Sequence, residues 1–258
     1  MIHLKSKILM IPIADNIPSR NKPIVNYALI GINVALFLWE LKLEVAGKLS
    51  AFIQHWGIVP ARISAVISDA LTGENPAAWV ALLMFSSSLL WAMFLHSSFG
   101  QILGNLLFLF VFGKSVENLL GHRRFLLLYL LGGILTGVVQ VLLDSTLTMP
   151  LIGANGAIAS ILGAYFLSFP KAKIDTILPL VIVFIPIELP ALFYLFWWFI
   201  QQMFYGIGSL NISGGVNPVG VGYWAHGVGL AIGAILVLLL KRRIDKKRTA
   251  EEQRTHKN

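Results

Sequence analysis

One short apolar stretch, residues 151–168 (LIGANGAIASILGAYFLS), limits the possible folds of this chain more than any other feature. From Asn155 to Ser168 it can form a helix of roughly 21 Å, because an α-helix rises about 1.5 Å per residue. A bilayer core is about 30 Å thick, so one end of such a helix must begin inside the membrane. Backbone N–H groups at a helix start are costly in lipid unless protein or water surrounds them. The stretch Gly153–Gly156 therefore predicts a functional site at membrane depth.

Composition places the remainder of the chain in a membrane as well. Hydrophobic residues make up 57% of the sequence, charged residues only 12%, and the mean hydropathy is +0.77. We predict an all-α, six-helix membrane domain over 25–240, between an N-terminal segment (1–24) and a basic tail (241–258). We expect no removable signal peptide at the start. The expected spans are 25–43, 94–112, 125–143, 155–168, about 190–206, and 221–240.

Two apolar segments fall outside these six spans. The run 77–90 lies within a long connection, 51–91, and is expected in the membrane interface. The apolar segment that begins at 177 is interrupted by Pro179 and Pro186. Because interior prolines break helices, we expect this segment to be non-helical or interfacial up to about Pro190, where a helix can start.

Charge distribution predicts the orientation and excludes several partners. With six spans, seventeen of the 20 Lys and Arg residues share the side that holds both termini. The positive-inside rule then places both termini in the cytoplasm, and we expect the membrane to be a bacterial inner (plasma) membrane. The basic tail directly follows a span, so we interpret it as a topology determinant that contacts anionic lipid, not nucleic acid. The chain has no cysteine and no HExxH-like pairing, so we expect neither a metal nor another cofactor.

A few polar residues fall in or next to apolar runs, where each should face protein or water. Gln101 and Asn105 are four residues apart and share a helix face. Small residues at 156, 160 and 164 and at 225, 229 and 233 predict that the fourth helix packs against the sixth, which would bring His226 near Asn155. The polar residues are Glu40, His96, Gln101, Asn105, Asn155, Glu188, Gln201, Gln202 and His226.

Each feature also has a purely structural interpretation. A membrane histidine can be a buried hydrogen-bonding residue, and glycine spacing can serve helix packing alone. Asparagine is among the best N-cap residues, so Asn155 can simply cap its helix. The combination of His226 with a helix that begins at membrane depth favours a functional site.

The order of motifs resembles the rhomboid family of intramembrane serine proteases. The second span carries His96, Gln101 and Asn105 where the family commonly has H-x-x-x-x-H-x-x-x-N. Gly153–Ala157 falls where the family has G-x-S-G, and Ala225–Gly233 matches its AHxxGxxxG pattern. Further similarity lies in 11–20, in 116–121 and in 124–129.

The resemblance implies a role for each matching position. His226 matches the general base, Asn105 the oxyanion asparagine, and His96 the first histidine of the second helix. Two positions depart from the family: Asn155 stands at the nucleophilic serine and Gln101 at the oxyanion histidine. A carboxamide at Gln101 can still donate a hydrogen bond, but Asn155 has no hydroxyl to activate. Other hydroxyls are poorly placed: Ser160 lies more than a turn deeper in the helix, and Ser97 and Ser98 lie in the second helix.

These departures lead to one main hypothesis and two alternatives. The main hypothesis is a catalytically inactive rhomboid, a pseudoprotease, that binds the transmembrane segments of client proteins through this polar site. The first alternative is an intramembrane serine endopeptidase whose serine has been replaced by Asn155 in this chain. The second is a channel or transporter, which the absence of a second discontinuous helix or a repeated half disfavours.

Overall fold

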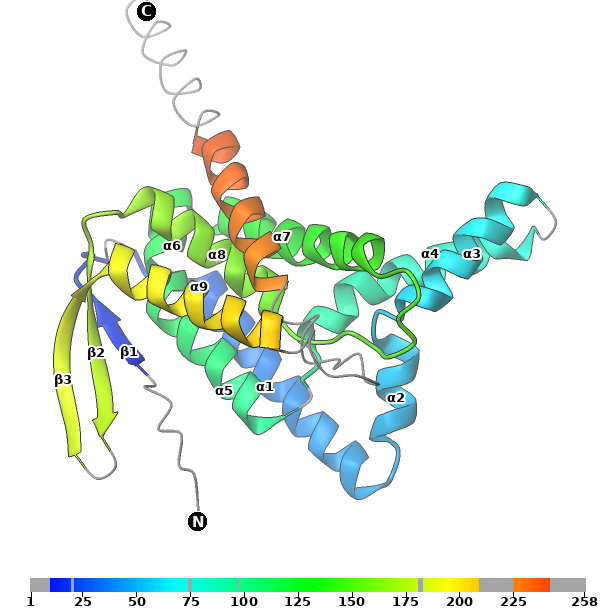
Figure 1. Ribbon diagram of the computed structural model, residues 1–258, viewed down its shortest axis with the longest axis horizontal. Helices are drawn as coiled ribbons and strands as arrows, with labels where there is room; N and C mark the ends of the chain where they lie inside the picture. Colours follow the sequence, from blue (N-terminus) through cyan, green and yellow to red (C-terminus); the bar gives the residue numbers. More distant parts are fainter. Residues whose placement is uncertain are drawn as a thin grey trace, which may run out of the picture.

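The computed structural model describes residues 10–19, 21–73, 76–96, 98–180, 183–208 and 225–241, with backbone only at 179, 180, 183 and 201–208. The chain is mostly helical, as predicted, with one small antiparallel sheet at one end (Figure 1). The helices are α1 (Ile24–Val45), α2 (Leu49–Trp56), α3 (Pro60–Thr72), α4 (Ala77–Trp91), α5 (Phe99–Phe108), α6 (Lys114–Leu120), α7 (His122–Leu143), α8 (Asn155–Ser168) and α9 (Ala191–Gly208). A 3₁₀ turn, η1 (Ala92–Phe94), extends α4, a π-helical turn, η2 (Leu109–Gly113), joins α5 to α6, and a C-terminal helix covers Ala225–Lys241.

Among the described residues, four helices are long and apolar enough to cross a membrane: Ile24–Val45, Ala77–Phe94, Phe99–Leu120 and His122–Leu143. Three shorter apolar helices are Asn155–Ser168, Ala191–Ile200 and Ala225–Lys241. The protein is therefore a multi-pass membrane protein, while the count of six spans stays a prediction. The run at 77–90, expected in the interface, forms a helix that meets the length and composition of a span. The beginning of the predicted last span, 221–224, lies outside the described residues.

The second predicted span begins later than expected. Sequence placed its start at residue 94, but α5 begins at Phe99 because the Ser98 hydroxyl accepts a hydrogen bond from the Gln101 N–H at 3.2 Å. His96 consequently lies in the turn before the helix. The helix then continues through η2 and α6 to Leu120.

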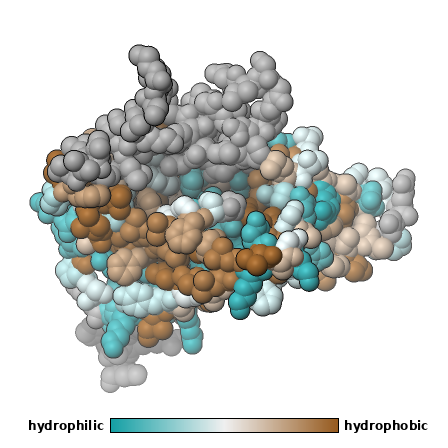
Figure 2. Space-filling view, turned by 90° about the horizontal axis from the view of Figure 1, so that it is seen from below, coloured by the Kyte–Doolittle hydropathy of each residue, from teal (hydrophilic) through white to brown (hydrophobic). Residues whose placement is uncertain are grey.

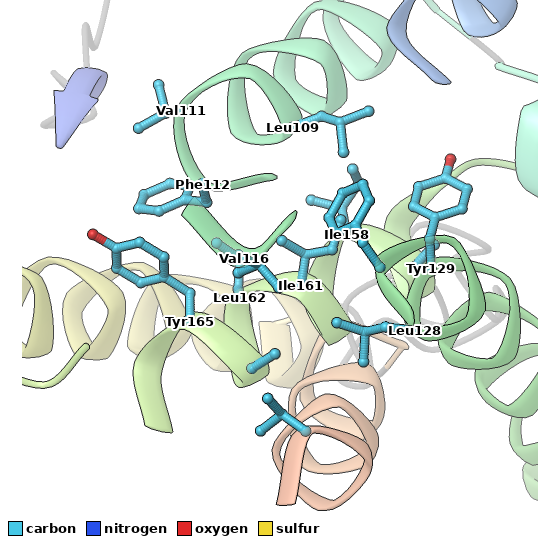
Figure 3. Close-up of a cluster of buried hydrophobic side chains, with 14 of the residues drawn as sticks. Leu109, Val111, Phe112, Val116, Leu128, Tyr129, Ile158, Ile161, Leu162 and Tyr165 are labelled. Carbon is cyan, nitrogen blue, oxygen red and sulfur yellow. The ribbon is translucent and has the colours of Figure 1, made fainter. Parts of the chain in front are cut away.

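Helix α8 is enclosed by other helices, and Figure 3 shows its side chains Ile158, Ile161, Leu162 and Tyr165 among those of neighbouring elements. It is buried at every position from Gly156 to Tyr165, which is the pattern of a helix surrounded by protein. Its apolar side chains pack among residues of α5–α6 and α7, and the ring of Tyr165 meets that of Phe112 edge-on at 4.9 Å between centroids. The core residues labelled in Figure 3 are Leu109, Val111, Phe112, Val116, Leu128, Tyr129, Ile158, Ile161, Leu162 and Tyr165.

The contacts of α8 with α7 show how deep its start lies. A Cβ atom at Gly156 would come within 2.6 Å of Thr136, and one at Gly132 would overlap Ser160, so the two helices run antiparallel in close contact. Thr136 lies seven residues before the end of α7, which corresponds to about 10 Å of helix. Helix α8 therefore begins about two turns inside the end of its neighbour, in agreement with the predicted internal start.

The predicted packing of the fourth helix against the last one is confirmed. A Cβ atom at Gly229 would lie 2.7 Å from the Gly156 carbonyl oxygen, and one at Gly233 would overlap the Ser160 backbone. The Ser160 hydroxyl also donates to the Gly229 carbonyl at 3.0 Å. Small residues allow the two parallel helices to approach this closely. Such packing is expected in membranes, where tight contacts and interhelical hydrogen bonds hold helices together.

The sheet comprises β1 (Ile11–Asp15), β2 (Lys173–Leu180) and β3 (Val183–Pro190) in that spatial order. The segment predicted to be non-helical forms the β2–β3 hairpin before α9, so that prediction is confirmed. The sequence did not predict the sheet itself. Asp15 fastens β1 to α6: its carboxylate accepts from the Ser115 hydroxyl at 2.6 Å and pairs with Lys114 at 3.1 Å. Glu188, expected inside the membrane, instead lies exposed on β3 and pairs with Lys173, which raises the pKa of that lysine.

The prolines of the hairpin fit its register. Pro186 pairs with Ile177, and Pro190 with Lys173. In antiparallel strands alternate residues direct their N–H groups toward the partner, and proline has none, so both prolines belong to the positions that face away from β2. The outer edge of β3 thereby loses two donors, which disfavours the addition of another strand.

The surface is largely apolar outside the sheet. Helix α1 exposes Ile24, Tyr27, Leu38 and Trp39, and α4 exposes Trp79 and Leu83. Figure 2 shows one face of the molecule on which hydrophobic residues form a broad central area with hydrophilic residues around it. An exposed apolar surface of this extent agrees with a lipid environment.

Candidate functional site

A cavity of about 680 Å³ lies where the N-terminal ends of α5 and α8 meet the start of the C-terminal helix. Its lining contains four of the five predicted site residues: Gln101, Asn105, Asn155 and His226. His96, the fifth, does not belong to the described lining and contacts Asn105 from behind. The structure thus gathers residues that lie 125 positions apart in the sequence.

Asn155 is the first residue of α8, and its backbone does not occupy the N-cap position. Ala154 is the N-cap, and the structure records no capping hydrogen bond from a side chain at this end. The Asn155 carboxamide nitrogen lies 3.4 Å from the place where a Cβ atom of Gly153 would be, so the side chain lies over that glycine. The N-cap interpretation of Asn155 is therefore wrong, and the side chain contributes to the cavity wall instead.

Residues 151–153, directly before α8, are held by three separate contacts with other described residues. Leu151 exchanges two backbone hydrogen bonds with Ile58, at 2.7 and 3.1 Å. The Gly153 N–H donates to the Ala92 carbonyl at 2.8 Å. Ile58 and Ala92 belong to the long 51–91 connection and the turn after it, whose role sequence left open. We conclude that this connection positions the start of α8.

Gln101 supplies the third contact. Its Nε2 donates to the Ile152 carbonyl at 3.3 Å. Gly153, with φ +118°, is the only residue type that fits beside this amide, because a Cβ atom there would overlap Nε2 and would be strained by the backbone conformation. Gln101 therefore bridges α5 to the loop that carries Asn155, in addition to lining the cavity.

His96 and Asn105 form a hydrogen-bonded pair across the start of α5. The two atoms that meet are Asn105 Nδ2 and His96 Nε2, at 3.3 Å. The other ring nitrogen of His96, Nδ1, lies 3.2 Å from the Phe94 carbonyl oxygen. Asn105 reaches the cavity, and His96 is almost fully buried behind it.

His226 lies against an aromatic residue of α9. The rings of His226 and Trp198 meet edge-to-face with centroids 5.2 Å apart, and Trp198 also contacts Phe108 of α5 at 5.5 Å. Trp198 and Phe108 both line the cavity. Helix α9 therefore closes the side of the cavity next to the histidine.

The two hydroxyl side chains of the described cavity lining, Ser98 and Thr136, each make a hydrogen bond within their own helix or its cap. Ser98 caps α5, and the Thr136 hydroxyl donates to the Gly132 carbonyl of its own helix at 2.7 Å. Ser160 is fully buried between α8 and the C-terminal helix. Ser97 lies outside the described residues. Among those described, none of these hydroxyls is placed as Asn155 is, at the first residue of α8.

Sequence reasoning missed several residues of this wall. The α7 residues Gly133, Thr136 and Gly137 line it, and the small-residue motif GGxxTG at 132–137 was a usable signal for close packing. Trp198 gave no usable signal, because sequence cannot choose between the two adjacent tryptophans of an apolar helix. Gln201 and Gln202 lie in the part of α9 described by its backbone only.

With this geometry in place, comparison with known proteins identifies the class. The rhomboid domain family matches residues 85–243, more than half of the chain. The protein belongs to the rhomboid family.

The proteins similar to this chain include mitochondrial and bacterial ones. The chain is 30% identical over 153 residues to Rhomboid protein 1, mitochondrial, of Saccharomyces cerevisiae, which covers 57% of this chain and 37% of the yeast protein. It is 34% identical over 93 residues to Presenilin-associated rhomboid-like protein A, mitochondrial, of Danio rerio, covering 35% of this chain and 24% of that protein. It is 35% identical over 111 residues to the protein named Putative rhomboid protease YdcA, of Bacillus subtilis, covering 42% of this chain and 52% of that protein. The matches therefore span about half or less of these relatives.

Proposed function

We propose that this protein is a rhomboid pseudoprotease that binds transmembrane segments of other membrane proteins without cutting them. The observation that carries the proposal is the position of Asn155. It is the first residue of the internal helix and shares a cavity with His226, so the place of an activatable hydroxyl is taken by a carboxamide. A histidine base cannot activate such a group as it activates a serine or a cysteine, because a carboxamide has no O–H or S–H for the imidazole to deprotonate.

The chemistry of the cavity supports a peptide ligand. Gln101, Asn105 and Asn155 offer carboxamides, which both donate and accept hydrogen bonds, and they carry no charge. In a bilayer, a client helix interrupted by glycine has backbone groups that need partners. These carboxamides can supply such partners, while the surrounding apolar wall accommodates the side chains of the client.

The proposed location rests on the distribution of charged residues. We propose a bacterial inner membrane with both termini in the cytoplasm, supported by the concentration of basic residues on one predicted side. The similarity to a Bacillus subtilis protein is compatible with this location.

Binding and cleavage can be separated with one synthetic probe. The probe is a fluorescent transmembrane peptide with two central glycines, added to the full chain in nanodiscs and followed by anisotropy and mass spectrometry. We expect saturable binding without cleavage, and an increase in Kd of about tenfold for Asn105→Leu, the equivalent of one or two hydrogen bonds. The matched control Gln54→Leu removes an exposed carboxamide outside the cavity and should leave Kd unchanged.

Two results would contradict the proposal. The first is a cleavage product that disappears in His226→Ala, which would make the chain a working protease. The second is a Kd that does not respond to Asn105→Leu or Asn155→Leu, which would place any client elsewhere.

A further inference from the structure

Helix α1 carries three polar side chains on its inward face, spaced seven residues apart. Asn26, Asn33 and Glu40 are 0%, 2% and 1% exposed, respectively. Seven residues correspond to about two helical turns, so the three form one stripe. A buried carboxyl group inside a membrane protein is costly unless it is hydrogen-bonded, which raises the question of what Glu40 holds.

Glu40 bonds across helices to the turn before α5. Both of its carboxyl oxygens accept from the His96 backbone N–H, at 3.1 and 3.2 Å. Phe37, one turn earlier on α1, meets the His96 ring edge-on with centroids 6.5 Å apart. Asn33 differs, because its carboxamide donates at 2.7 Å to the Leu29 carbonyl of its own helix.

The hydrogen bonds of His96 determine its tautomer. The Phe94 carbonyl oxygen, 3.2 Å from Nδ1, can only accept, so Nδ1 carries the proton. Nε2 of the neutral ring is then an acceptor, and the atom that faces it is Asn105 Nδ2. One N–H of Asn105 is thus directed away from the cavity, which fixes the rotation of the carboxamide and therefore what it presents to a ligand.

We propose that Glu40 is a positioning residue for Asn105, acting through His96. It holds the backbone of the His96 turn, the turn holds the ring in one tautomer, and the ring orients the carboxamide at the cavity wall. This inference rests on the proposed function, because it assigns the orientation of Asn105 a role in binding a client peptide.

The first measurement is ¹⁵N NMR of the full chain labelled at histidine, with His96 assigned by substitution. The wild type should show His96 as the Nδ1–H tautomer. Glu40→Met removes the acceptor and should give a mixture of tautomers, whereas Glu40→Gln keeps an acceptor oxygen and should preserve the wild-type spectrum. Asn33→Leu, a polar-to-apolar change on the same stripe, should leave the His96 signals in place.

The second measurement is the affinity for the two-glycine transmembrane peptide. We expect Glu40→Met to raise Kd about fivefold, comparable to the loss of one hydrogen bond. Glu40→Gln and Asn33→Leu should stay within about twofold of the wild type, even if either lowers the melting temperature. Should Glu40→Met fail to fold, Glu40→Asp withdraws the carboxyl by one methylene and is expected to act in the same direction.

The two readouts separate the two ideas. An unchanged tautomer in Glu40→Met overturns the positioning role, whatever the peptide does. A mixed tautomer with unchanged peptide affinity supports the positioning of Asn105 and overturns the client-binding role of the cavity. A purely structural Glu40 would lower the melting temperature in Glu40→Met and Asn33→Leu alike without changing the His96 tautomer, and that result also overturns the inference.

Discussion

Gly233 of the C-terminal helix packs directly on the backbone of Ser160 in α8, so that a Cβ atom at Gly233 would overlap the Ser160 carbonyl oxygen. This contact brings together two helices that are separated by the whole β2–β3 hairpin and α9. It also fixes the position of His226 along the helix axis relative to Asn155. On these parallel helices, Asn155 lies about one and a half turns before Ser160, and His226 about two turns before Gly233.

Substitution of Gly233 should therefore separate these helices. We expect Gly233→Ala to lower the free energy of unfolding by about 1–3 kcal/mol, since overpacking a tight contact forces backbone shifts. Thermal unfolding in detergent measures the change. Gly31→Ala is the matched control, because nothing lies within 4 Å of a Cβ atom there and the residue is exposed. Equal melting temperatures for the two variants would contradict the close packing.

Comparing Gly153→Ala with Gly73→Ala separates backbone strain from steric overlap at the start of α8. Gly153→Ala combines a φ of +118° with a collision against Gln101, and we expect a loss of stability of about 2 kcal/mol or more. Gly73→Ala, at φ +73° with nothing within 4 Å, carries only the backbone strain of about 1 kcal/mol. If Gly153→Ala unfolds no more easily than Gly73→Ala, Gln101 does not approach the loop as described.

The sheet register can be tested with cysteines, because the chain has none of its own. Asp175 and Glu188 are paired across β2 and β3, so Asp175→Cys with Glu188→Cys should form a disulfide on mild oxidation. Asp175→Cys with Ile187→Cys places the thiols on opposite faces of the sheet and should stay reduced. Non-reducing peptide mapping distinguishes the pairs, and preferential crosslinking of the second pair would show a register shifted by one residue.

Introducing a serine at residue 155 tests the relation of this position to His226. We expect Asn155→Ser to react with a fluorophosphonate probe, and the labelling rate to fall about 100-fold or more when His226→Ala is added, because a general base contributes that much. Gln101→His, added to Asn155→Ser, should increase the rate further by supplying an oxyanion donor of the family type. Labelling that is indifferent to His226 would mean that the imidazole does not reach residue 155.

The site is partly readable from sequence and partly not. The short apolar stretch and the small residues at 229 and 233 predicted the internal helix and its packing, because helix length and close approach are local properties of the chain. The start of the second span was misplaced, since an apolar run does not show where a Ser98 hydroxyl caps it. The sheet was missed because β1 and β2 are far apart in sequence and each strand alone has little signal.

By itself, the sequence determined that this protein lies in a membrane, that one of its helices is too short to cross, and that Asn155 brings no hydroxyl to the helix start. These follow from composition, length and side-chain chemistry. Only the tertiary structure decided that the 51–91 connection holds the loop before α8, that Gln101 bridges to that loop, and that Glu40 reaches the His96 turn. Those contacts join residues tens of positions apart, and the physical reason is that their geometry depends on how whole helices pack.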